Sequence, residues 1–396
     1  MKKSWWVLRI GLALALSLGV WGALPVAQAR PLASSTITGC PLDQAITTAN
    51  QGSATGTCTL AGAGAPYTVT LSGDVSLTAA LPSITSDIVI NTDGTTRTID
   101  QPSEDAASVF DVGSSGKLTL IKIRVIATGG NADGIDVAAN GELTMVDSTL
   151  DGLIFGVESE GTLTVRNSTV ANSALGIWAF GGSVTISNST LSDNSGDGLD
   201  INAPASATIS YSTIVGNSNG LDINDGSITI STTIVAQNQF SDCQVSSGSI
   251  ASGDYNIEAN ASCGFTALHD QQHVTPLQLA MNSTLAANNS LNGTSTHALG
   301  ATSAAVNQIP GGFPGCNLTP GDPNRSTDQR GGWRAGVGCD VGAFEYNAIN
   351  PTAPNAITLS DFQASPSIEA GGTWLIAVLV LLGTSALFAV RRRTAR

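Results

Sequence analysis

The stretch GVESEGTLTVRNSTVA at residues 156–171 is followed by GIWAFGGSVTISNSTLS at residues 176–192, and both follow one pattern. Each begins with Gly and an aliphatic residue and continues to an apolar-flanked Ser-Thr pair. The Gly-aliphatic pairs begin at Gly134, Gly156, Gly176, Gly198 and Gly220. The Ser-Thr phrases begin at Asp147, Asn167, Asn188, Tyr211 and Ser231. A repeat of this length, with alternating apolar residues, has room for two or three short strands and no helix. The pattern predicts an all-β parallel β-helix.

The geometry of such a solenoid explains its composition. Successive coils stack ~4.8 Å apart, so each inward side chain meets its counterpart one repeat away. We expect Gly and Asn at the corners, often with positive φ. One corner ladder is predicted to contain Asn172, Asn194, Asn217 and Asn238. Crossovers between parallel strands are overwhelmingly right-handed, which predicts a right-handed coil.

The two ends of the chain have the composition of export and anchoring signals. Residues 1–29 combine early basic residues, an apolar run and Ala27-Gln28-Ala29, which predicts a signal peptide. Residues 373–390 are uncharged and apolar and are followed by a basic tail at 391–396, which predicts a transmembrane helix with that tail in the cytoplasm. We therefore expect a cell-surface protein, anchored by this helix with its body outside the cytoplasm, and a linker at 347–372.

The body of the chain is strongly acidic. Residues 31–372 contain all 30 acidic residues and only eight Lys and Arg residues, a net charge of −22. Nucleic acids and anionic lipid surfaces require basic patches, so they are excluded as partners of this body. The acidic surface serves solubility, and multivalent cations such as Ca²⁺ are the remaining interpretation. No cofactor is expected otherwise.

Six cysteines lie in the predicted exported part, which favours disulfides. Six cysteines permit many connectivities, among which sequence does not choose. Locality favours the pairs Cys40–Cys58, Cys243–Cys263 and Cys316–Cys339, at the two ends of the repeat region, where a solenoid must protect its edges. No CxxC motif supports a zinc interpretation.

The repeat region divides the exported body. Residues 40–50 have apolar positions at helical spacing, which predicts an amphipathic helix within an N-terminal cap at 30–59. The coils are expected over 60–243. Irregular sequence follows at 244–346, and we call this segment the closing region.

Short motifs at both ends resemble the bacterial surface proteins with a choice-of-anchor Q domain. The segment CPLDQAI from Cys40 resembles the CSLREA-type start of many of them, with Asp43-Gln44 in place of a basic-acidic pair. The further motif residues are Tyr255-Asn256, Cys263-Gly264-Phe265, Thr296-His297-Ala298-Leu299, Asp328-Gln329-Arg330-Gly331, Arg334 and Cys339-Asp340 with Gly342-Ala343-Phe344-Glu345. The resemblance implies a right-handed β-helix displayed on a cell surface by a variable C-terminal anchor, with no activity common to the family.

One column of residues is the candidate ligand-binding face. The residues that follow the Gly-aliphatic pairs are Asp136, Glu158, Trp178, Asp200 and Asp222. Their neighbours are apolar and should point inward, so these five side chains should point outward, one per coil. An indole flanked by carboxylates suits a sugar chain, because the ring offers an apolar platform and the acids accept hydrogen bonds from hydroxyls. The alternative interpretation is a solvated face with one incidental aromatic residue.

The sequence also offers candidates for two other chemistries, polysaccharide cleavage and zinc binding. A polysaccharide lyase or glycoside hydrolase would use two carboxylates of the same column, such as Asp200 and Asp222 with Asp197 nearby. Many β-helices cleave polysaccharides, but fold does not imply function, and we favour a non-catalytic role in adhesion, carbohydrate contact or envelope structure. The pair His269 and His273 has zinc-ligand spacing but no helix is expected there, so a structural use is favoured and no metal site is predicted.

Overall fold

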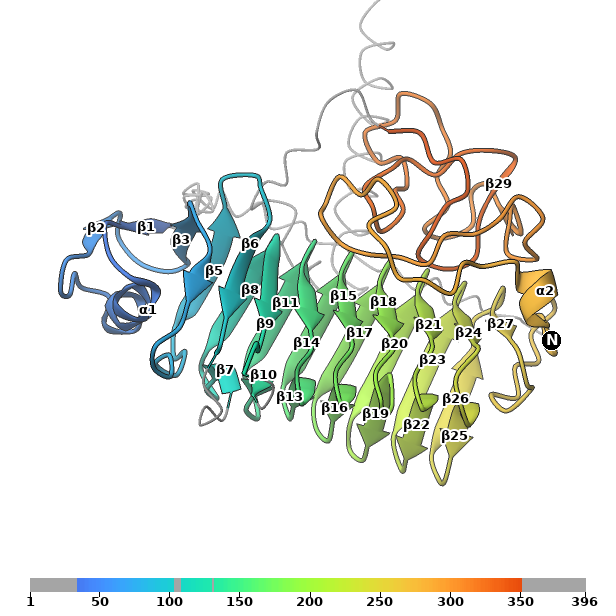
Figure 1. Ribbon diagram of the computed structural model, residues 1–396, viewed down its shortest axis with the longest axis horizontal. Coiled ribbons are helices and arrows are strands. Elements are labelled where there is room, and N and C mark those ends of the chain that lie inside the picture. Colours follow the sequence, from blue (N-terminus) through green and yellow to red (C-terminus); the bar gives the residue numbers. More distant parts are fainter. Residues whose placement is uncertain (1–33, 103–107, 130–131, 351–396) are drawn as a thin grey trace, which may run out of the picture. The chain divides into compact units, whose positions relative to one another are not determined.

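The computed structural model describes residues 34–102, 108–129 and 132–350. Strands from successive coils build three long sheets, of 11, seven and nine strands, and from β7 onward each coil contributes one strand to each sheet (Figure 1). All neighbouring strands in these sheets are parallel except β1 and β2. The parallel β-helix predicted from the repeat is therefore confirmed.

The strands of each sheet have the following bounds. The 11-stranded sheet contains β2 (Thr59–Ala61), β1 (Ser35–Thr38), β3 (Tyr67–Leu71), β5 (Asp87–Thr92), β8 (Lys117–Ile121), β11 (Glu142–Val146), β14 (Thr162–Arg166), β17 (Ser183–Ser187), β20 (Ser206–Ser210), β23 (Ser227–Ser231) and β26 (Ser249–Ser252). The seven-stranded sheet contains β7 (Ser108–Val112), β10 (Asp133–Val137), β13 (Phe155–Ser159), β16 (Leu175–Ala179), β19 (Leu199–Asn202), β22 (Asn219–Asn224) and β25 (Ser241–Val245). The nine-stranded sheet contains β4 (Val75–Ser76), β6 (Arg97–Asp100), β9 (Ile123–Ile126), β12 (Thr149–Asp151), β15 (Thr169–Ala171), β18 (Thr190–Ser192), β21 (Thr213–Val215), β24 (Ile234–Ala236) and β27 (Ile257–Glu258).

The core consists of columns of aliphatic side chains, one residue per coil. In the seven-stranded sheet the column Ile135, Val157, Ile177, Leu199 and Leu221 is fully buried and in register. Each such side chain contributes about 1.5–3 kcal/mol through burial of apolar surface. The columns from the three sheets join one continuous hydrophobic cluster that begins at α1.

The repeated glycines are required because a Cβ would clash with the next coil, and not because the backbone adopts positive φ. None of Gly134, Gly156 and Gly176 has positive φ, so the expectation of positive φ at corner glycines does not extend to these three. A Cβ added to Gly156 would lie 2.4 Å from the carbonyl oxygen of Gly176 on the next coil. Gly134 would meet the oxygen of Gly156 at the same distance. Adjacent coils are therefore in direct backbone contact at this position, and a residue larger than Gly would push them apart.

The Ser of the Ser-Thr phrase forms a buried ladder at one corner. The backbone N–H of Ser148 donates to Ser168 Oγ at 3.1 Å, that of Ser168 to Ser189 Oγ at 3.2 Å, and that of Ser189 to Ser212 Oγ at 3.3 Å. The residue before each of these serines has positive φ. A hydroxyl thus pairs a backbone donor that the turn leaves without a strand partner.

A second corner contains the asparagine ladder, with one difference from the prediction. Asn194 Nδ2 donates to Asn217 Oδ1 at 2.8 Å, and Asn217 Nδ2 donates to Asn238 Oδ1 at 3.2 Å. Asn172 is exposed and bonds to Asp151 instead, so its assignment to the ladder is wrong. Ser173 takes that level, because its N–H donates to Asn194 Oδ1 at 3.0 Å. Asn172 itself has positive φ and makes the turn.

The N-terminal end of the stack contains the predicted helix, α1 (Leu42–Gln51) (Figure 1). Its buried face includes Leu42, Ala45 and Ile46, which pack into the main core. The helix ends at Gly52, whose left-handed conformation suits a residue without a Cβ. The disulfide Cys40–Cys58 brackets the helix. That the helix acts as a cap stays a prediction.

The closing region is mostly irregular and has its own core. Its first residues still form β26 and β27 of the coils, and beyond them it contains the short helix α2 (Pro276–Leu279) and the antiparallel pair β28 (Ile309–Pro310) and β29 (Gly338–Cys339). A second hydrophobic cluster joins it to the coils through Tyr211, Val215 and Ile234. The disulfides Cys243–Cys263 and Cys316–Cys339 lie in this part of the chain, in the pairs that locality favoured.

The Thr of the Ser-Thr phrase is where the closing region docks. Gln329 Nε2 donates to Thr169 Oγ1 at 2.9 Å, and Thr190 Oγ1 donates to Gln329 Oε1 at 2.6 Å. The backbone N–H of Ala343 donates to Thr213 Oγ1 at 3.0 Å. These threonines occupy one register position of β15, β18 and β21, beside which the closing region lies in orange (Figure 1). The outer side of the nine-stranded sheet is therefore covered there.

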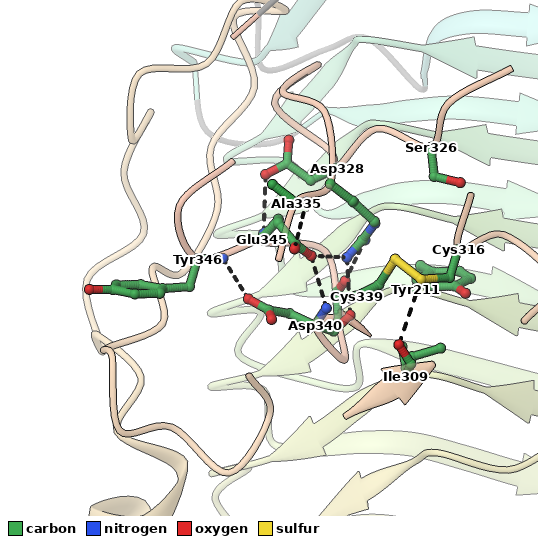
Figure 2. Close-up of polar contacts among 12 residues, drawn as sticks. Tyr211, Ile309, Cys316, Ser326, Asp328, Ala335, Cys339, Asp340, Glu345 and Tyr346 are labelled. Carbon is green, nitrogen blue, oxygen red and sulfur yellow. Dashed lines mark hydrogen bonds and ion pairs between the residues drawn. A yellow bond between two sulfur atoms is a disulfide. The ribbon is translucent and has the colours of Figure 1, made fainter. Parts of the chain in front are cut away.

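The motif residues of the closing region meet in one buried polar network. Arg334 is fully buried, donates to Glu345 Oε2 at 3.1 Å and lies 4.7 Å from the ring of Tyr211. The backbone N–H of Glu345 donates to Asp328 Oδ2 and that of Tyr346 to Asp340 Oδ2 (Figure 2). Burial raises the pKa of Glu345 to about 7, against the opposing charge of Arg334. These motifs thus hold the closing region together on the coils.

The predicted fold class is wrong in one part, the transmembrane helix. In the described ranges, which end at residue 350, no helix is long and apolar enough to cross a membrane. Residues 373–390 lie outside the described residues, as do the predicted signal peptide at 1–29 and the basic tail at 391–396.

Candidate functional site

The five predicted face residues form one column on the seven-stranded sheet. Asp136 pairs with Glu158, Glu158 with Trp178, Trp178 with Asp200, and Asp200 with Asp222, each across neighbouring parallel strands. Parallel strands are ~4.8 Å apart, so the column offers one side chain per strand spacing along the solenoid. It continues to Asp111 on β7 and to Gln244 on β25.

The inward and outward directions agree with the predicted alternation. Ile135 and Val137 are fully buried, whereas Asp136 between them is exposed. Ile177 is fully buried, whereas Trp178 is half-buried. Asp222 is the most enclosed member of the column, with 9 % of its surface exposed. The column therefore has an open end at β10 and a more enclosed end at β22.

Trp178 is part of an aromatic patch, formed with Phe155 and Phe180. The ring centroid of Trp178 is 5.7 Å from that of Phe155 and 4.8 Å from that of Phe180. The rings are tilted by 31° and 42° to the indole, and all three side chains are half-buried. We call these three residues the aromatic patch. The three rings pack against one another, so the exposed surface of the aromatic patch is preorganised.

The carboxyl groups of the column crowd one another. Burial raises the pKa of Glu158, and the nearby charges of Asp136 and Asp133 raise it further. Burial also raises the pKa of Asp200, to about 6, with added repulsion from Asp222 and Asp197. Crowded carboxylates of this kind favour a bound positive charge or a bound proton.

Side-chain amides satisfy part of this charge at the enclosed end. Asn202 Nδ2 donates to Asp200 Oδ1 at 2.9 Å, and Gln244 Nε2 donates to Asp222 Oδ2 at 3.3 Å. The nearby amide of Asn224 lowers the pKa of both carboxyls. Asp222 Oδ1 is nevertheless buried with no hydrogen-bond partner among the described residues. One carboxylate oxygen at this end of the face is therefore buried without a hydrogen bond.

No metal site emerges from the acidic residues. Among the residues that the structure describes, no group of three or more His, Cys, Asp and Glu side chains is arranged to hold a metal ion. His269 contacts Asp254 Oδ2 through Nδ1 at 2.6 Å, and its ring stacks on Tyr255 at 4.5 Å. His273 makes a left-handed turn. His269 therefore has a structural contact in this region, and the structural use of the pair stays a prediction.

Phe155 and Phe180 are functional candidates that the sequence reading missed. Phe180 lies two residues after Trp178, so strand alternation predicts that both side chains share a face. Phe155 lies two residues before the fully buried Val157, so alternation does not predict an outward side chain there, and the residue pairs with Leu175 of the next coil. Only the contact between Phe180 and Trp178 could therefore be predicted from the sequence of a single repeat.

The three sheets, with stacked columns and ladders at their corners, define a right-handed parallel β-helix. Residues 109–275 match the family model described as Right handed beta helix region, which confirms the predicted hand. A similar solved structure is described as the crystal structure of pectate lyase Pel9A. It is 14 % identical, with 71 % of this chain and 88 % of that chain covered and a TM-score of 0.36. No protein of curated function matches the chain.

Proposed function

We propose that this protein is an exported, non-catalytic β-helix that binds a polysaccharide chain along the outer face of its seven-stranded sheet. The observation that carries the proposal is the aromatic patch at Trp178, with carboxylates of the same column on the strands either side of it. A partly exposed aromatic surface in such a polar setting is characteristic of an interaction site.

The chemistry of the face suits a sugar chain. Sugar rings have apolar faces that stack on aromatic rings, and they have hydroxyls that donate to carboxylates. The carboxylates of Glu158 and Asp200 lie on the strands either side of Trp178. A chain laid along the solenoid would therefore meet acceptors on both sides of the indole. Three disulfides support export, because they persist in oxidising compartments.

A glycan array probed with the purified full-length protein tests this function. Binding to at least one extended glycan is expected, and Trp178→Ala should weaken it at least tenfold, because aromatic anchors carry much of a binding free energy. Thr229→Ala on the exposed face of the 11-stranded sheet is the matched control. Absence of binding to all extended glycans would contradict the proposal.

A polysaccharide-cleaving enzyme is the second candidate, and the raised pKa of Asp200 is the observation that favours it. A carboxyl that titrates near 6 next to a second carboxyl resembles the acid of a glycoside hydrolase more than the cationic base of a lyase. Assays of reducing sugar and of unsaturated uronide on the same glycans separate the two candidates. Product formation that Asp200→Asn abolishes would replace the binding function with hydrolysis.

We also infer that the closing region is of the choice-of-anchor Q type. Its motif residues Asp328, Arg334 and Glu345 meet in one buried network rather than lying scattered over the surface, which supports a shared structural role. If the motifs have this role, exchanging the closing region for that of a protein of this type should preserve folding of the coils, as measured by circular dichroism and thermal unfolding.

A further inference from the structure

We propose that the glycan bound along this face carries positively charged amino groups, as an amino-sugar polymer with free amines does. This inference rests on the proposed function and adds the charge of the ligand. It follows from the distribution of charge over the three sheets, from the position of the carboxylates relative to the aromatic patch, and from an unpaired buried acceptor.

Charge is segregated by sheet. The described strands of the seven-stranded sheet contain no Lys, Arg or His. The basic residues of the coils lie on the other two sheets or at a corner, where Lys117 contacts Glu142 at 2.6 Å and Arg124 contacts Asp151 at 2.5 Å. The three arginines of the closing region belong to its own contacts. The seven-stranded sheet therefore presents a column of acids with no basic residue on any of its described strands.

The carboxylates lie on both sides of the aromatic patch along the solenoid. Asp136 and Glu158 precede Trp178 in the column, and Asp200 and Asp222 follow it. A chain that stacks a sugar ring on the indole therefore brings its neighbouring units over carboxylates in both directions. Each ammonium group has three donors and can bridge carboxylates from adjacent strands. The repeat of the face, ~4.8 Å per strand, is of the size of a sugar unit.

At the enclosed end of the column, one carboxylate oxygen makes no hydrogen bond to the described residues. Asp222 Oδ1 is buried without a hydrogen-bond partner among the described residues, and the whole residue is 9 % exposed. A buried carboxylate oxygen without a donor is costly, and an ammonium group offers the charge-assisted hydrogen bond that would satisfy it. Burial raises the pKa of Asp200, repulsion from Asp222 and Asp197 raises it further, and a bound ammonium group would relieve that repulsion.

The same charges disfavour the other glycan classes. A polyuronate would place its own carboxylates beside those of Glu158 and Asp200, and like charges in contact are repulsive. A neutral glycan would stack on the patch, and its hydroxyls would donate hydrogen bonds to the carboxylates of the column. It would leave the crowded negative charges uncompensated. Amines are therefore the groups that distinguish the preferred ligand.

Titration calorimetry with the purified full-length protein tests the charge of the ligand. The probes are glucosamine oligomers, N-acetylglucosamine oligomers and galacturonate oligomers of equal length. Glucosamine oligomers should bind at least tenfold more tightly than the other two, with an affinity that falls as NaCl is added. The double variant Asp200→Asn/Asp222→Asn should lose about tenfold in that affinity, because charge-assisted hydrogen bonds are removed. Asp43→Asn, an exposed site on α1, is the control for loss of a charge away from the face and should bind like the wild type.

The outcomes separate this inference from the function on which it rests. If N-acetylated or uronate oligomers bind as tightly and Trp178→Ala weakens them, the charge inference is wrong and the glycan-binding function stands. If glucosamine oligomers bind equally well to wild type, to Trp178→Ala and to the double variant, the acidic surface attracts them non-specifically and the inference is overturned. If no oligomer binds, both proposals fail. Circular dichroism of each variant verifies that the coils are folded.

Discussion

Asp200 and Asp222 pair across the neighbouring strands β19 and β22, and this pairing sets the acidity of the face. Burial and the adjacent charge of Asp222 raise the pKa of Asp200 to about 6. An aspartate in an unfolded chain titrates near ~3.9. Between these values the folded protein binds more protons than the unfolded chain, so the contribution of Asp200 to stability falls as pH rises from about 4 to about 6. The face is therefore held at a cost that a bound cation would relieve.

Asp200→Asn should increase the free energy of unfolding at pH 7 by about 1–2 kcal/mol, after allowance for solvent screening at a half-buried site. At pH 4 the gain should be small, because Asp200 is then protonated in the folded protein and half-protonated in the unfolded chain. Urea denaturation of the full-length protein at the two pH values measures the difference. An equal gain at both pH values would mean that the asparagine stabilises the fold through its hydrogen bonds instead.

Trp178→Ala and Ile177→Asp test the direction of adjacent side chains. Trp178 is half-buried and outward, so its removal should leave the coils folded and lower stability modestly. Ile177 is fully buried, and an unpaired carboxylate there should cost several kcal/mol and disrupt the stack. Thermal unfolding followed by circular dichroism compares the two variants. If both lose the same stability, Trp178 has a core role and the outward assignment of the column is wrong.

Gly156→Ala tests the close approach of the coils. The added Cβ would lie 2.4 Å from the carbonyl oxygen of Gly176, so the two strands must separate, and we expect a loss of about 3 kcal/mol or more. Gly73→Ala is the control, because Gly73 has no positive φ and no atom within 4 Å of the added Cβ. Denaturant unfolding of both variants gives the comparison. A similar, small effect at both sites would show that the stack absorbs a methyl group without strain.

Arg334→Met should detach the closing region from the coils. It removes one partner of a fully buried ion pair and leaves Glu345 uncompensated, a change that costs about 3–5 kcal/mol. Limited proteolysis with mass spectrometry should then show new cleavage between residues 276 and 350, with the coils intact.

The double variant Arg334→Met/Glu345→Gln should recover part of this protection, because no buried charge is left unpaired. Lys117→Met, in an exposed ion pair, is the control and should leave the cleavage pattern unchanged. Cleavage that is equal in Arg334→Met and wild type would show that the apolar contacts alone hold the closing region.

The coils could be predicted from sequence because the same local pattern recurs in each of several repeats. Alternation gave the direction of Asp136 and Trp178, since it depends only on adjacent residues in one strand. The purpose of Gly156 could not be predicted in this way. Its requirement comes from an atom of the next coil, and a glycine needed for space looks in sequence like a glycine needed for positive φ.

The site shows the same limit. The column follows from the repeat, but the second aromatic contact, from Phe155, depends on how two coils are aligned. Asn172 is one residue before the ladder position of its coil, which Ser173 occupies. The spacing between Asn172 and Asn194 does not reveal this difference. The docking role of Thr169 and Thr190 was also invisible, because Gln329 lies far along the chain and outside the repeat.

The hydrogen bonds of the closing region to Thr169, Thr190 and Thr213 have a consequence for how such a chain changes during evolution. These threonines belong to three successive coils, so the closing region spans a fixed segment of the solenoid. A duplicated coil inserted between β15 and β21 would draw these partners apart. One inserted before β15 would leave every one of these bonds in place and lengthen the opposite face by ~4.8 Å. Coils added before β15 would therefore keep these three bonds, at the expense of the 3.4 Å contact between Thr96 Oγ1 and the carbonyl of Asn292 when they are inserted after Thr96. The length of the seven-stranded face can thus change while the C-terminal end of the coils stays constant.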